Sequence, residues 1–233
     1  MLNRKELRQT LRQARRELHC LARMEREAAI LRAIRQHPRL KRLRHLALYW
    51  PSDGEVDLRT ILNSHSAAQQ HYLPILVRGS RLRFVPWSNN SPMRPNRFGI
   101  PEPRAHRHEQ LRPNQLDAVL MPLVGFDAHG NRLGMGGGFY DRSFAFRHAR
   151  RRWRKPLLIG VAFELQRCPP LPAAAWDVPL DGIVTEHGLR WFESPLAPLF
   201  QRGGTVKCPP FSKRGTVKFH MPTLKKSARN LIL

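Results

Sequence analysis

The sequence predicts one α/β domain of the Rossmann-like three-layer type, with a mostly parallel open sheet and helices on both of its faces. Residues 118–126 and 156–163 are nearly continuous apolar runs, which are typical of parallel strands covered on both sides. Segments with helical spacing alternate with these strands, as in other α/β proteins. The apolar content is 41% of 233 residues, which is sufficient for a substantial core.

Residues 2–36 are predicted to form a helix that ends before His37-Pro38, because apolar residues recur at the spacing of one helix face. The opposite face is basic, and we interpret most of it as a solvated surface. Those of its side chains that lie near the N-terminus could reach a bound triphosphate. The basic residues are Arg4, Lys5, Arg8, Arg12, Arg15 and Arg16.

The first strand is expected over 45–50, followed by a turn at 51–54 and a helix that begins near Glu55. Trp50 and Glu55 would then lie at the end of a strand and the start of a helix, where open α/β sheets bind their ligands. A second interpretation is also open. Trp50 could be a core residue, and Glu55 could be a favourable charge at a helix N-terminus.

Residues 71–77 and 81–87 predict two strands joined by a short hairpin connection at 78–80. Residues 88–112, rich in proline, asparagine and arginine, predict a long irregular loop that could fold over a ligand. The last strand is expected over 180–186, after a proline-rich segment, 166–179, that contains Asp177.

Residues 132–142 read R-L-G-M-G-G-G-F-Y-D-R and are called the glycine segment below. Four glycines within five positions allow a ligand to approach the backbone closely. A helix is expected over 139–152, so free backbone N–H groups at its start could bind phosphate. The spacing matches neither the P-loop nor the dinucleotide motif. A phosphate-binding loop and a glycine-rich hairpin or connector both remain open.

The net charge of +24 comes from 41 basic and 17 acidic residues and attracts anions such as nucleic acid or nucleotides. A merely solvated basic surface is the alternative, since no nucleic-acid recognition motif is present. Residues 201–233 contain eight basic residues and no acidic ones. We expect a domain over 1–200 and a flexible basic extension over 201–233, which could contact nucleic acid weakly.

Cys20, Cys168 and Cys208 are widely spaced and form no C-x-x-C pair, so we expect reduced thiols and no zinc site. The apolar runs are too short to span a bilayer, and the N-terminus lacks the apolar region of a signal peptide. The expectation is a soluble, cytoplasmic monomer that does not require a membrane or nucleic acid.

Six motifs occur in a fixed order over residues 3–192. They are N-R-K-E-L-R, Y-W-P-S-D-G-E-V-D, G-I-P-E-P, M-P-L-V-G-F-D-A-H-G-N with the glycine segment after it, I-G-V-A-F-E-L-Q, and W-D-V-P-L-D-G-I-V-T-E. Together they resemble the 5-formyltetrahydrofolate cyclo-ligase family, whose members are also called 5,10-methenyltetrahydrofolate synthetases. The resemblance does not cover the extension.

The resemblance implies ATP-dependent cyclisation of 5-formyltetrahydrofolate to 5,10-methenyltetrahydrofolate, with release of ADP and phosphate and with Mg2+ as cofactor. It implies catalytic roles for Arg132 and Tyr140. Lys5 is our first choice among the N-terminal cations. The ATP-binding residues implied are Arg4, Lys5, Arg8, Arg132, Leu133, Gly134, Met135, Gly136, Gly137, Gly138, Phe139 and Tyr140.

For the folate, the resemblance implies contacts from Trp50 and Glu55 and from the aromatic pair Phe139 and Tyr140. An aromatic face suits the flat pterin, and a carboxylate suits its ring N–H donors. Many relatives carry tyrosine where this chain has Phe139, and any role of that hydroxyl is lost here. Some relatives carry lysine where this chain has Gly137.

For the metal, the resemblance implies Asp141 and Asp177, since Mg2+ takes one or two carboxylates together with phosphate and water. A role for Asp141 at a helix start or in a salt bridge is the alternative. Two other functions remain open for the whole chain: a basic nucleic-acid-binding protein, and a nucleotide-binding module without catalysis. Nucleic-acid binding would depend steeply on salt and survive loss of Asp141 or Glu55.

Overall fold

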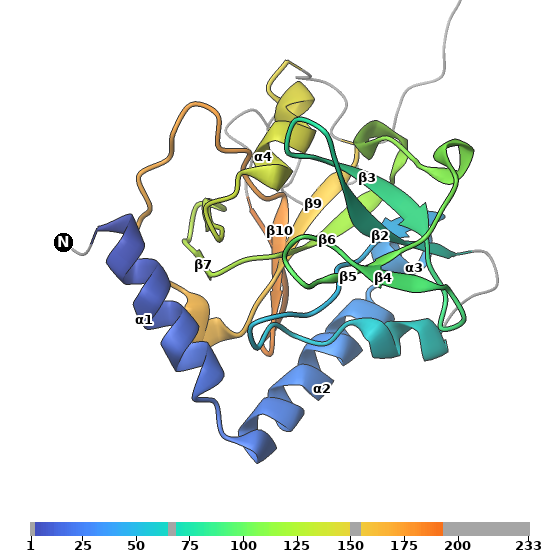
Figure 1. Cartoon of the computed structure of the whole chain (residues 1–233). Coiled ribbons are helices and arrows are strands. Elements are labelled where there is room, and N and C mark those ends of the chain that lie inside the picture. Colours follow the sequence, from blue (N-terminus) through green and yellow to red (C-terminus); the bar gives the residue numbers. More distant parts are fainter. Residues whose placement is uncertain (1–2, 65–68, 150–154, 193–233) are drawn as a thin grey trace, which may run out of the picture. The chain divides into compact units, whose positions relative to one another are not determined.

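The computed structural model describes residues 3–64, 69–149 and 155–192. The main sheet has the order β11-β10-β9-β6-β1-β2-β3, with strands β1 (His45–Ala47), β2 (Gln70–Val77), β3 (Arg81–Pro86), β6 (Ala118–Pro122), β9 (Leu157–Val161), β10 (Gly182–Thr185) and β11 (Gly188–Trp191). The strands from β10 to β2 run parallel, and both edge strands run antiparallel to their neighbours. Figure 1 shows this sheet at the centre of the domain.

The remaining elements are helices and two small hairpins around this sheet. The hairpins pair β4 (Met93–Pro95) with β5 (Pro101–Pro103), and β7 (Gly125–Phe126) with β8 (Arg132–Leu133). The helices are α1 (Arg4–Arg16), α2 (Cys20–Gln36), α3 (Pro38–Lys41), α4 (Phe139–Phe144), and the 3-10 turns η1 (Arg59–Ser64), η2 (Arg107–Glu109), η3 (Pro113–Gln115), η4 (Ala145–Arg147) and η5 (Glu164–Gln166).

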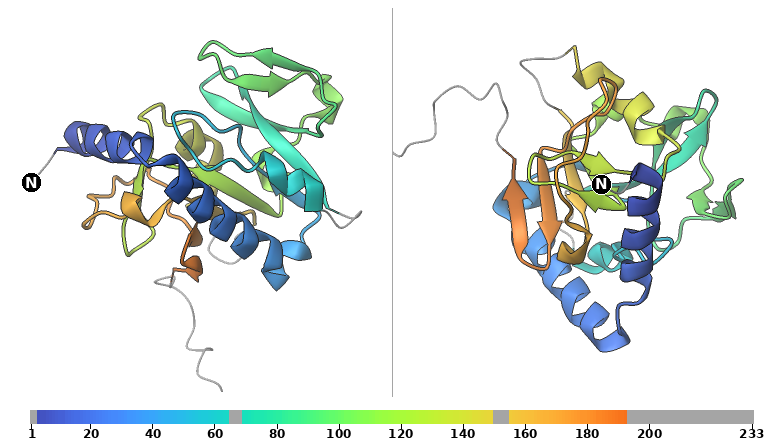
Figure 2. Two further views of the ribbon diagram at one scale, coloured as in Figure 1. Left: turned by 90° about the horizontal axis from the view of Figure 1, so that it is seen from below. Right: turned by 90° about the vertical axis from the view of Figure 1, so that its left-hand side faces the viewer.

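The core lies on both faces of the sheet, as the three-layer prediction requires. Successive side chains of a strand point to opposite faces. Leu120 of β6 therefore packs in a buried cluster with Ile30 of α2, while Met121 packs in a second cluster with Phe144 of α4. Figures 1 and 2 show α2 and α4 on opposite sides of the sheet. The predicted fold class is confirmed.

The predicted N-terminal helix over 2–36 was wrong in one respect, because the chain forms two helices there. Asn3 caps α1 by accepting hydrogen bonds from Lys5 and Glu6 N–H groups, and Glu6 completes a capping box. α1 ends at Arg16, and α2 begins at Cys20. Arg23 of α2 donates a 2.6 Å hydrogen bond to the Arg15 carbonyl in the last turn of α1. This contact satisfies a helix-end carbonyl and stabilises the bend.

The helix predicted to begin near Glu55 is absent; only the 3-10 turn η1 follows, from Arg59. The Tyr49 hydroxyl donates a 2.9 Å hydrogen bond to the Val56 carbonyl and so occupies an acceptor that a helix would use. Val56 and Leu58 are both buried, with the alternation of an extended segment. Tertiary contacts therefore replace the expected helix.

Three other predicted segments differ in detail. Residues 88–112 contain the β4–β5 hairpin, although their prolines indicate an irregular loop. The strand over 118–126 is divided into β6 and β7, and the helix over 139–152 is only α4 followed by η4, with 150–152 outside the described residues. The strand over 45–50 ends at Ala47. The strands predicted over 71–77, 81–87, 156–163 and 180–186 are confirmed.

Cys20 is exposed and Cys168 is half-buried, and both are free thiols. Cys208 and the predicted extension over 201–233 lie outside the described residues. Among the helices that the structure describes, none is both long and apolar enough to cross a membrane.

Candidate active site

The strand order places a topological switch point between β1 and β6. From β1 the chain adds β2 on one side, whereas β6 lies on the other side and is followed outward by β9 and β10. Ligands of open α/β sheets bind where the segments after two such strands diverge, at the carboxyl ends. Trp50 and Glu55 follow β1, and the glycine segment follows β6. The two predicted halves of the site therefore belong to the same end of the sheet.

The glycine segment connects the β7–β8 hairpin to α4. Gly136 and Gly138 have φ angles of +96° and +63°, a left-handed conformation that favours glycine. At Gly137 the reason is different, since a Cβ atom there would lie 2.6 Å from the Phe139 ring. The glycines thus form a strand-to-helix connector, in which Gly136 and Gly137 are exposed.

Arg132 and Asp141 form a nearly buried ion pair within this segment. The Arg132 guanidinium donates a 2.6 Å hydrogen bond to Asp141 Oδ1, with side-chain exposures of 6% and 18%. Asp141 Oδ1 also accepts a 3.1 Å bond from the Val178 N–H. Arg132 Nε is buried and makes no hydrogen bond to the described residues. A buried N–H without a partner is costly, so this atom is suited to an anionic ligand.

Helix α1 contributes two of the predicted cations to the same region. Arg8 Nε donates a 2.8 Å hydrogen bond to the Gly134 carbonyl, and Arg4 contacts Asp177 Oδ2 at 3.3 Å. Burial and the nearby positive charge of Arg4 lower the pKa of Arg8, against the opposing charge of Asp177. Lys5, by contrast, is exposed on the first turn of α1.

The two predicted metal ligands can be compared with what Mg2+ requires. The hydrogen bonds to Asp141 reach Oδ1, and those to Asp177, from Arg4 and the Ala174 N–H, reach Oδ2. Each carboxylate thus keeps a second oxygen outside these bonds. In the described part of the chain no group of three or more His, Cys, Asp or Glu residues could hold a metal. A metal held by these two carboxylates would therefore need its other ligands from phosphate and water, as Mg2+ does in many sites.

Glu55 is held by Ser52 in the other half of the site. The Ser52 N–H and hydroxyl lie 3.1 and 3.3 Å from Glu55 Oε2. Burial raises the pKa of Glu55 to about 7, and the positive charge of Arg15 opposes this rise. Burial also raises the pKa of the Tyr140 hydroxyl, and the negative charge of Glu55 adds to the effect.

The other aromatic residues make contacts that the sequence does not predict. Trp50 packs edge-to-face against Trp87, with ring centroids 6.1 Å apart, and the Arg59 guanidinium lies 4.9 Å from its centroid. Phe139 packs edge-to-face against Phe98 at 5.8 Å, so the β4–β5 hairpin reaches the glycine segment.

Leu133, Met135 and Tyr140 are the other predicted ATP-binding residues of the glycine segment. Leu133 is fully buried in a cluster with Leu11 and Leu171, so its side chain is part of the core. Met135 is 54% exposed. The Tyr140 ring stacks on Phe144 with centroids 6.3 Å apart.

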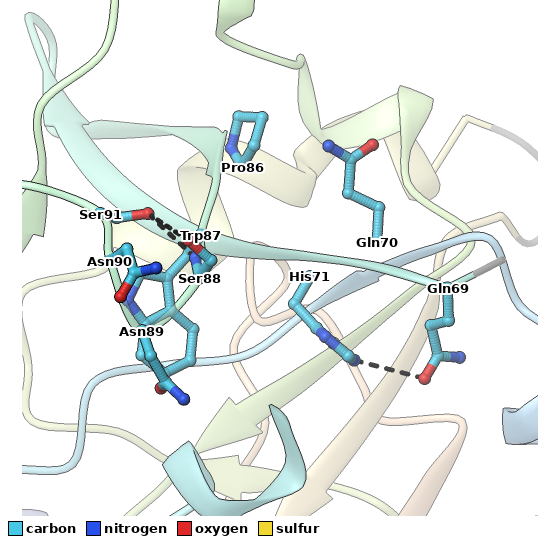
Figure 3. A pocket seen from close by; sticks show the side chains of 9 residues that line it. All are labelled: Gln69, Gln70, His71, Pro86, Trp87, Ser88, Asn89, Asn90 and Ser91. Atoms are coloured by element: carbon cyan, nitrogen blue, oxygen red, sulfur yellow. Dashed lines mark hydrogen bonds between the residues drawn. The ribbon is translucent and has the colours of Figure 1, made fainter. Parts of the chain in front are cut away.

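A cavity of about 570 Å³ lies between the start of β2 and the end of β3 (Figure 3). None of the predicted site residues lines it. Its wall includes Trp87, the residue that packs against Trp50. The residues that line it are Gln69, Gln70, His71, Pro86, Trp87, Ser88, Asn89, Asn90 and Ser91.

The interpretation of the α1 arginines as solvated was wrong for Arg15, which is 1% exposed. Arg12, Arg15 and Arg16 all pair with Asp53, in the turn between Trp50 and Glu55. The sequence does contain a signal for this, because Arg15 follows Leu11 by four residues and so lies on the buried side of α1. Asp53 is expected from sequence only as a turn residue.

Comparison with known proteins identifies the family of this chain. The 5-formyltetrahydrofolate cyclo-ligase family model matches residues 1–186. A 5-formyltetrahydrofolate cyclo-ligase from Haemophilus influenzae is 34% identical over 186 residues, covering 78% of this chain and 96% of that protein. One from Escherichia coli K12 is 35% identical over 145 residues, covering 60% of this chain and 76% of that protein.

A solved structure of a relative has the same fold as this chain. The NMR structure of Aquifex aeolicus 5,10-methenyltetrahydrofolate synthetase superposes with a TM-score of 0.70 and 30% identity, covering 87% of this chain and 100% of that one. The match to the family model extends over the switch point, the glycine segment, Asp177 and the α1 cations. The chain is therefore an enzyme of the ligase class and belongs to the 5-formyltetrahydrofolate cyclo-ligase family.

Proposed function

We propose that this enzyme closes the ring of 5-formyltetrahydrofolate to give 5,10-methenyltetrahydrofolate, using ATP and releasing ADP and phosphate. The observation that carries the proposal is that two unlike half-sites follow β1 and β6, the two strands on either side of the switch point. One half is cationic and has open backbone, as a triphosphate requires. The other half carries a carboxylate next to aromatic rings, as a pterin requires.

The reaction needs activation of the formyl oxygen, which is a poor leaving group. Its attack on the γ-phosphate of ATP converts it into a phosphate ester, and the neighbouring folate amine then closes the ring while phosphate leaves. Such a transfer depends on positioning and on neutralising phosphate charge. We assign both tasks to the backbone N–H groups of residues 134–138 and to the Arg132 guanidinium, whose Nε is buried without a hydrogen-bond partner among the described residues.

The cations of α1 extend this surface for the triphosphate. Arg8 already touches the Gly134 carbonyl, and Arg4 lies beside Asp177. We assign both to ATP in preference to Lys5, whose side chain is exposed. Asp141 and Asp177 would hold Mg2+ through their second oxygens, and the ion would supply further neutralisation of phosphate charge.

Glu55 is the residue we assign to the pterin ring. As a carboxylate it accepts hydrogen bonds from ring N–H donors, and its raised pKa leaves it half-ionised near pH 7. Trp50, Phe139 and Tyr140 would bound the flat ring system with aromatic surface. Tyr140 would act as a hydrogen-bond donor and not as an acid, because its raised pKa makes loss of its proton less favourable.

The direct test is to add 5-formyltetrahydrofolate and magnesium-ATP to the purified protein and follow the absorbance of the methenyl product. We expect absorbance to develop only when ATP and the folate are both present. A folded protein that binds ATP but forms no methenyl product would instead indicate a nucleotide-binding module without catalysis.

A further inference from the structure

The turn that separates Trp50 from Glu55 has an unfavourable backbone conformation. Asp53 and Gly54 have φ angles of +50° and +76°, and the Glu55 N–H donates a 2.9 Å bond to the Ser52 carbonyl. Glycine adopts this left-handed region freely, whereas aspartate does so at some cost. A turn of this kind persists when surrounding contacts stabilise it. The position of Glu55 therefore depends on what holds Asp53.

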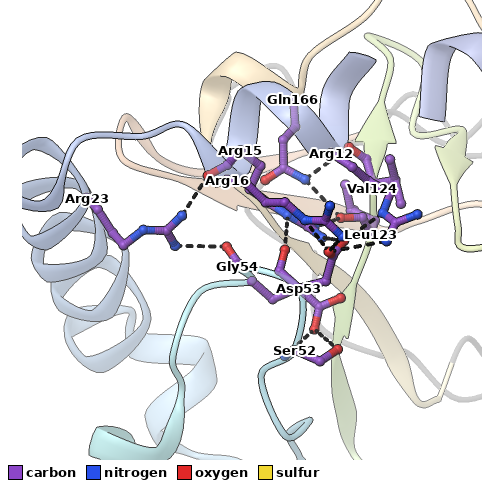
Figure 4. A network of polar contacts seen from close by, with 11 residues as sticks. Arg12, Arg15, Arg16, Arg23, Ser52, Asp53, Gly54, Leu123, Val124 and Gln166 are labelled. Carbon is purple, nitrogen blue, oxygen red and sulfur yellow. Dashed lines mark hydrogen bonds and ion pairs between the residues drawn. The ribbon is translucent and has the colours of Figure 1, made fainter. Parts of the chain in front are cut away.

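Helix α1 supplies those contacts through three arginines (Figure 4). Arg12 forms a two-pronged pair with the Asp53 carboxylate, at 2.7 and 3.2 Å. Arg16 contacts Oδ1 of the same carboxylate, and Arg15 contacts Oδ2 at 2.7 Å. From α2, Arg23 donates a 2.9 Å bond to the Gly54 carbonyl.

Arg15 differs from its neighbours because it is buried and joins two segments of the site. Its Nε donates a 3.0 Å bond to the Asp53 carbonyl, and its other terminal nitrogen donates a 3.1 Å bond to the Leu123 carbonyl. Asp53 follows β1 and Leu123 follows β6, so Arg15 spans the switch point. Gln166 supports the same place by donating to the Leu123 and Val124 carbonyls at 2.9 and 3.0 Å.

The charges of this network act on Glu55 in opposite directions. Burial opposes ionisation of Asp53, but hydrogen bonds from Arg12 and Arg16 and the charge of Arg15 lower its pKa to about 2. Asp53 is therefore ionised and raises the pKa of Glu55, whereas Arg15 lowers it. The other titratable groups that interact with Glu55 are Tyr49, which follows β1, and Tyr140 of α4.

We propose that Arg15 is a positioning residue for the folate half of the site, which fixes the Glu55 carboxylate by clamping the Asp53 turn to the segment after β6. This inference rests on the proposed function, since it gives Glu55 a folate-binding role. Arg15 does not touch the substrate in this account. Because α1 also carries Arg4 and Arg8, the same rigid helix connects the ATP half of the site to the folate half.

The test compares Arg15→Met, Arg15→Lys and Asp53→Asn with the wild-type enzyme over a range of pH. We expect Arg15→Met to raise KM for the folate by about 10-fold to 100-fold, with a smaller change in KM for ATP, because a misplaced carboxylate weakens substrate alignment. Arg15→Lys keeps the charge but loses the three-way bonding, so it should recover only part of this loss.

The pH profile distinguishes positioning from general support of the fold. Without the Arg15 charge, the midpoint of folate binding should move to higher pH, and without the Asp53 charge it should move to lower pH. A purely structural role would not move the two midpoints in opposite directions. The proposal would be overturned if the pH midpoint of folate binding were the same in all variants. It would also be overturned if Arg15→Met and Asp53→Asn moved this midpoint in the same direction.

Arg147→Met is the matched control. Arg147 also forms a buried arginine–aspartate pair, at 2.7 Å with Asp181, but Asp181 bonds the Leu158 N–H near the start of β9, away from the carboxyl ends of the strands. It should lower stability without moving the folate midpoint, and an equal rise in folate KM here would refute a specific role for Arg15. If Arg15→Met does not fold, Arg15→Lys should still raise the folate KM without moving the midpoint, because it keeps the charge, and Asp53→Asn should still move the midpoint to lower pH.

Equilibrium binding of 5-formyltetrahydrofolate, followed by tryptophan fluorescence in the absence of ATP, separates the two proposals. A wild-type protein that binds the folate with the expected midpoint but forms no methenyl product contradicts the proposed function alone. Binding that is identical in wild type and Arg15→Met contradicts the Arg15 proposal alone.

Discussion

Arg132 and Asp141 are bound to each other at 2.6 Å, and the Arg132 side chain is only 6% exposed. The pair leaves a hydrogen-bond donor on Arg132 and an acceptor oxygen on Asp141. Arg132 keeps a buried Nε without a hydrogen-bond partner among the described residues, and Asp141 keeps its second oxygen outside the bonds to Arg132 and Val178. In the proposed reaction, we expect the Arg132 Nε to bind phosphate and the second oxygen of Asp141 to bind Mg2+.

Asp141→Asn tests the metal role. The amide oxygen can still accept the Val178 bond, but the charge that Mg2+ and Arg132 require is lost. We expect kcat to fall about 100-fold and the Mg2+ requirement to rise, with folate binding unchanged. Titration of initial rates with Mg2+ measures both effects.

Asp117→Asn is the control for this substitution. Asp117 accepts bonds from the Arg44 and His45 N–H groups and pairs with Lys155 at 2.8 Å, near the start of β1. It should keep the wild-type Mg2+ dependence. An Asp141→Asn enzyme with that same dependence would exclude the metal role.

The raised pKa of Glu55 predicts that the stability of the protein depends on pH, and this can be measured without substrate. Its pKa of about 7 in the folded protein exceeds the ordinary value of 4.5. The folded state therefore binds more protons than the unfolded state between these values, and the free energy of unfolding falls as pH rises through this window. Across this window, the free energy of unfolding of Glu55→Gln should therefore fall by up to about 3 kcal/mol less than that of the wild type.

Chemical denaturation between about pH 4 and about pH 8 measures that slope. Glu109→Gln, at an exposed position of η2, is the control and should keep the wild-type slope. Parallel curves for wild type and Glu55→Gln would mean that Glu55 is not the group responsible.

Gly137 and Gly134 offer a matched pair of substitutions by alanine. At Gly137 the new Cβ would lie 2.6 Å from the Phe139 ring, whereas at Gly134 the nearest atom is 3.9 Å away. Gly137→Ala should therefore displace Phe139 and lower kcat/KM by about 10-fold or more, and Gly134→Ala should cost less. Equal losses in the two variants would show that the Phe139 contact does not matter.

Removal of residues 201–233 tests whether the basic extension is needed. The family model ends at residue 186, before this segment. We expect cyclisation to persist, and any salt-dependent binding of nucleic acid to be lost, since the eight basic residues are removed. Loss of cyclisation in a truncated protein that still folds would make the extension part of the enzyme.

The fold could be predicted because its central strands are continuous apolar runs. β11 was missed because none of its residues is buried, so it lacks that pattern. The bend between α1 and α2 depends on the Arg23 bond to the Arg15 carbonyl, and periodicity does not reveal such a contact. Where a helix is expected at Glu55, the Tyr49 hydroxyl instead bonds the Val56 carbonyl, which is likewise a contact that periodicity does not reveal.

The site could be predicted only in part, for the same reason. The glycine segment can be recognised from its composition, whereas the residues that contact it are distant in sequence. Arg8 is 126 positions from Gly134, and Val178 is 37 positions from Asp141. Arg15 was interpreted as solvated together with the other arginines of α1, although its four-residue spacing from Leu11 indicates the buried side of the helix, where the structure places it.

The most direct measurement of the central claim is the stoichiometry of ADP and methenyl product in one reaction. Wild-type protein, magnesium-ATP and 5-formyltetrahydrofolate should give one ADP for each methenyltetrahydrofolate formed, because each ring closure requires one phosphorylated formyl oxygen. Ring closure at the same rate without ATP, or ADP release that continues without the folate and without product, would contradict the account.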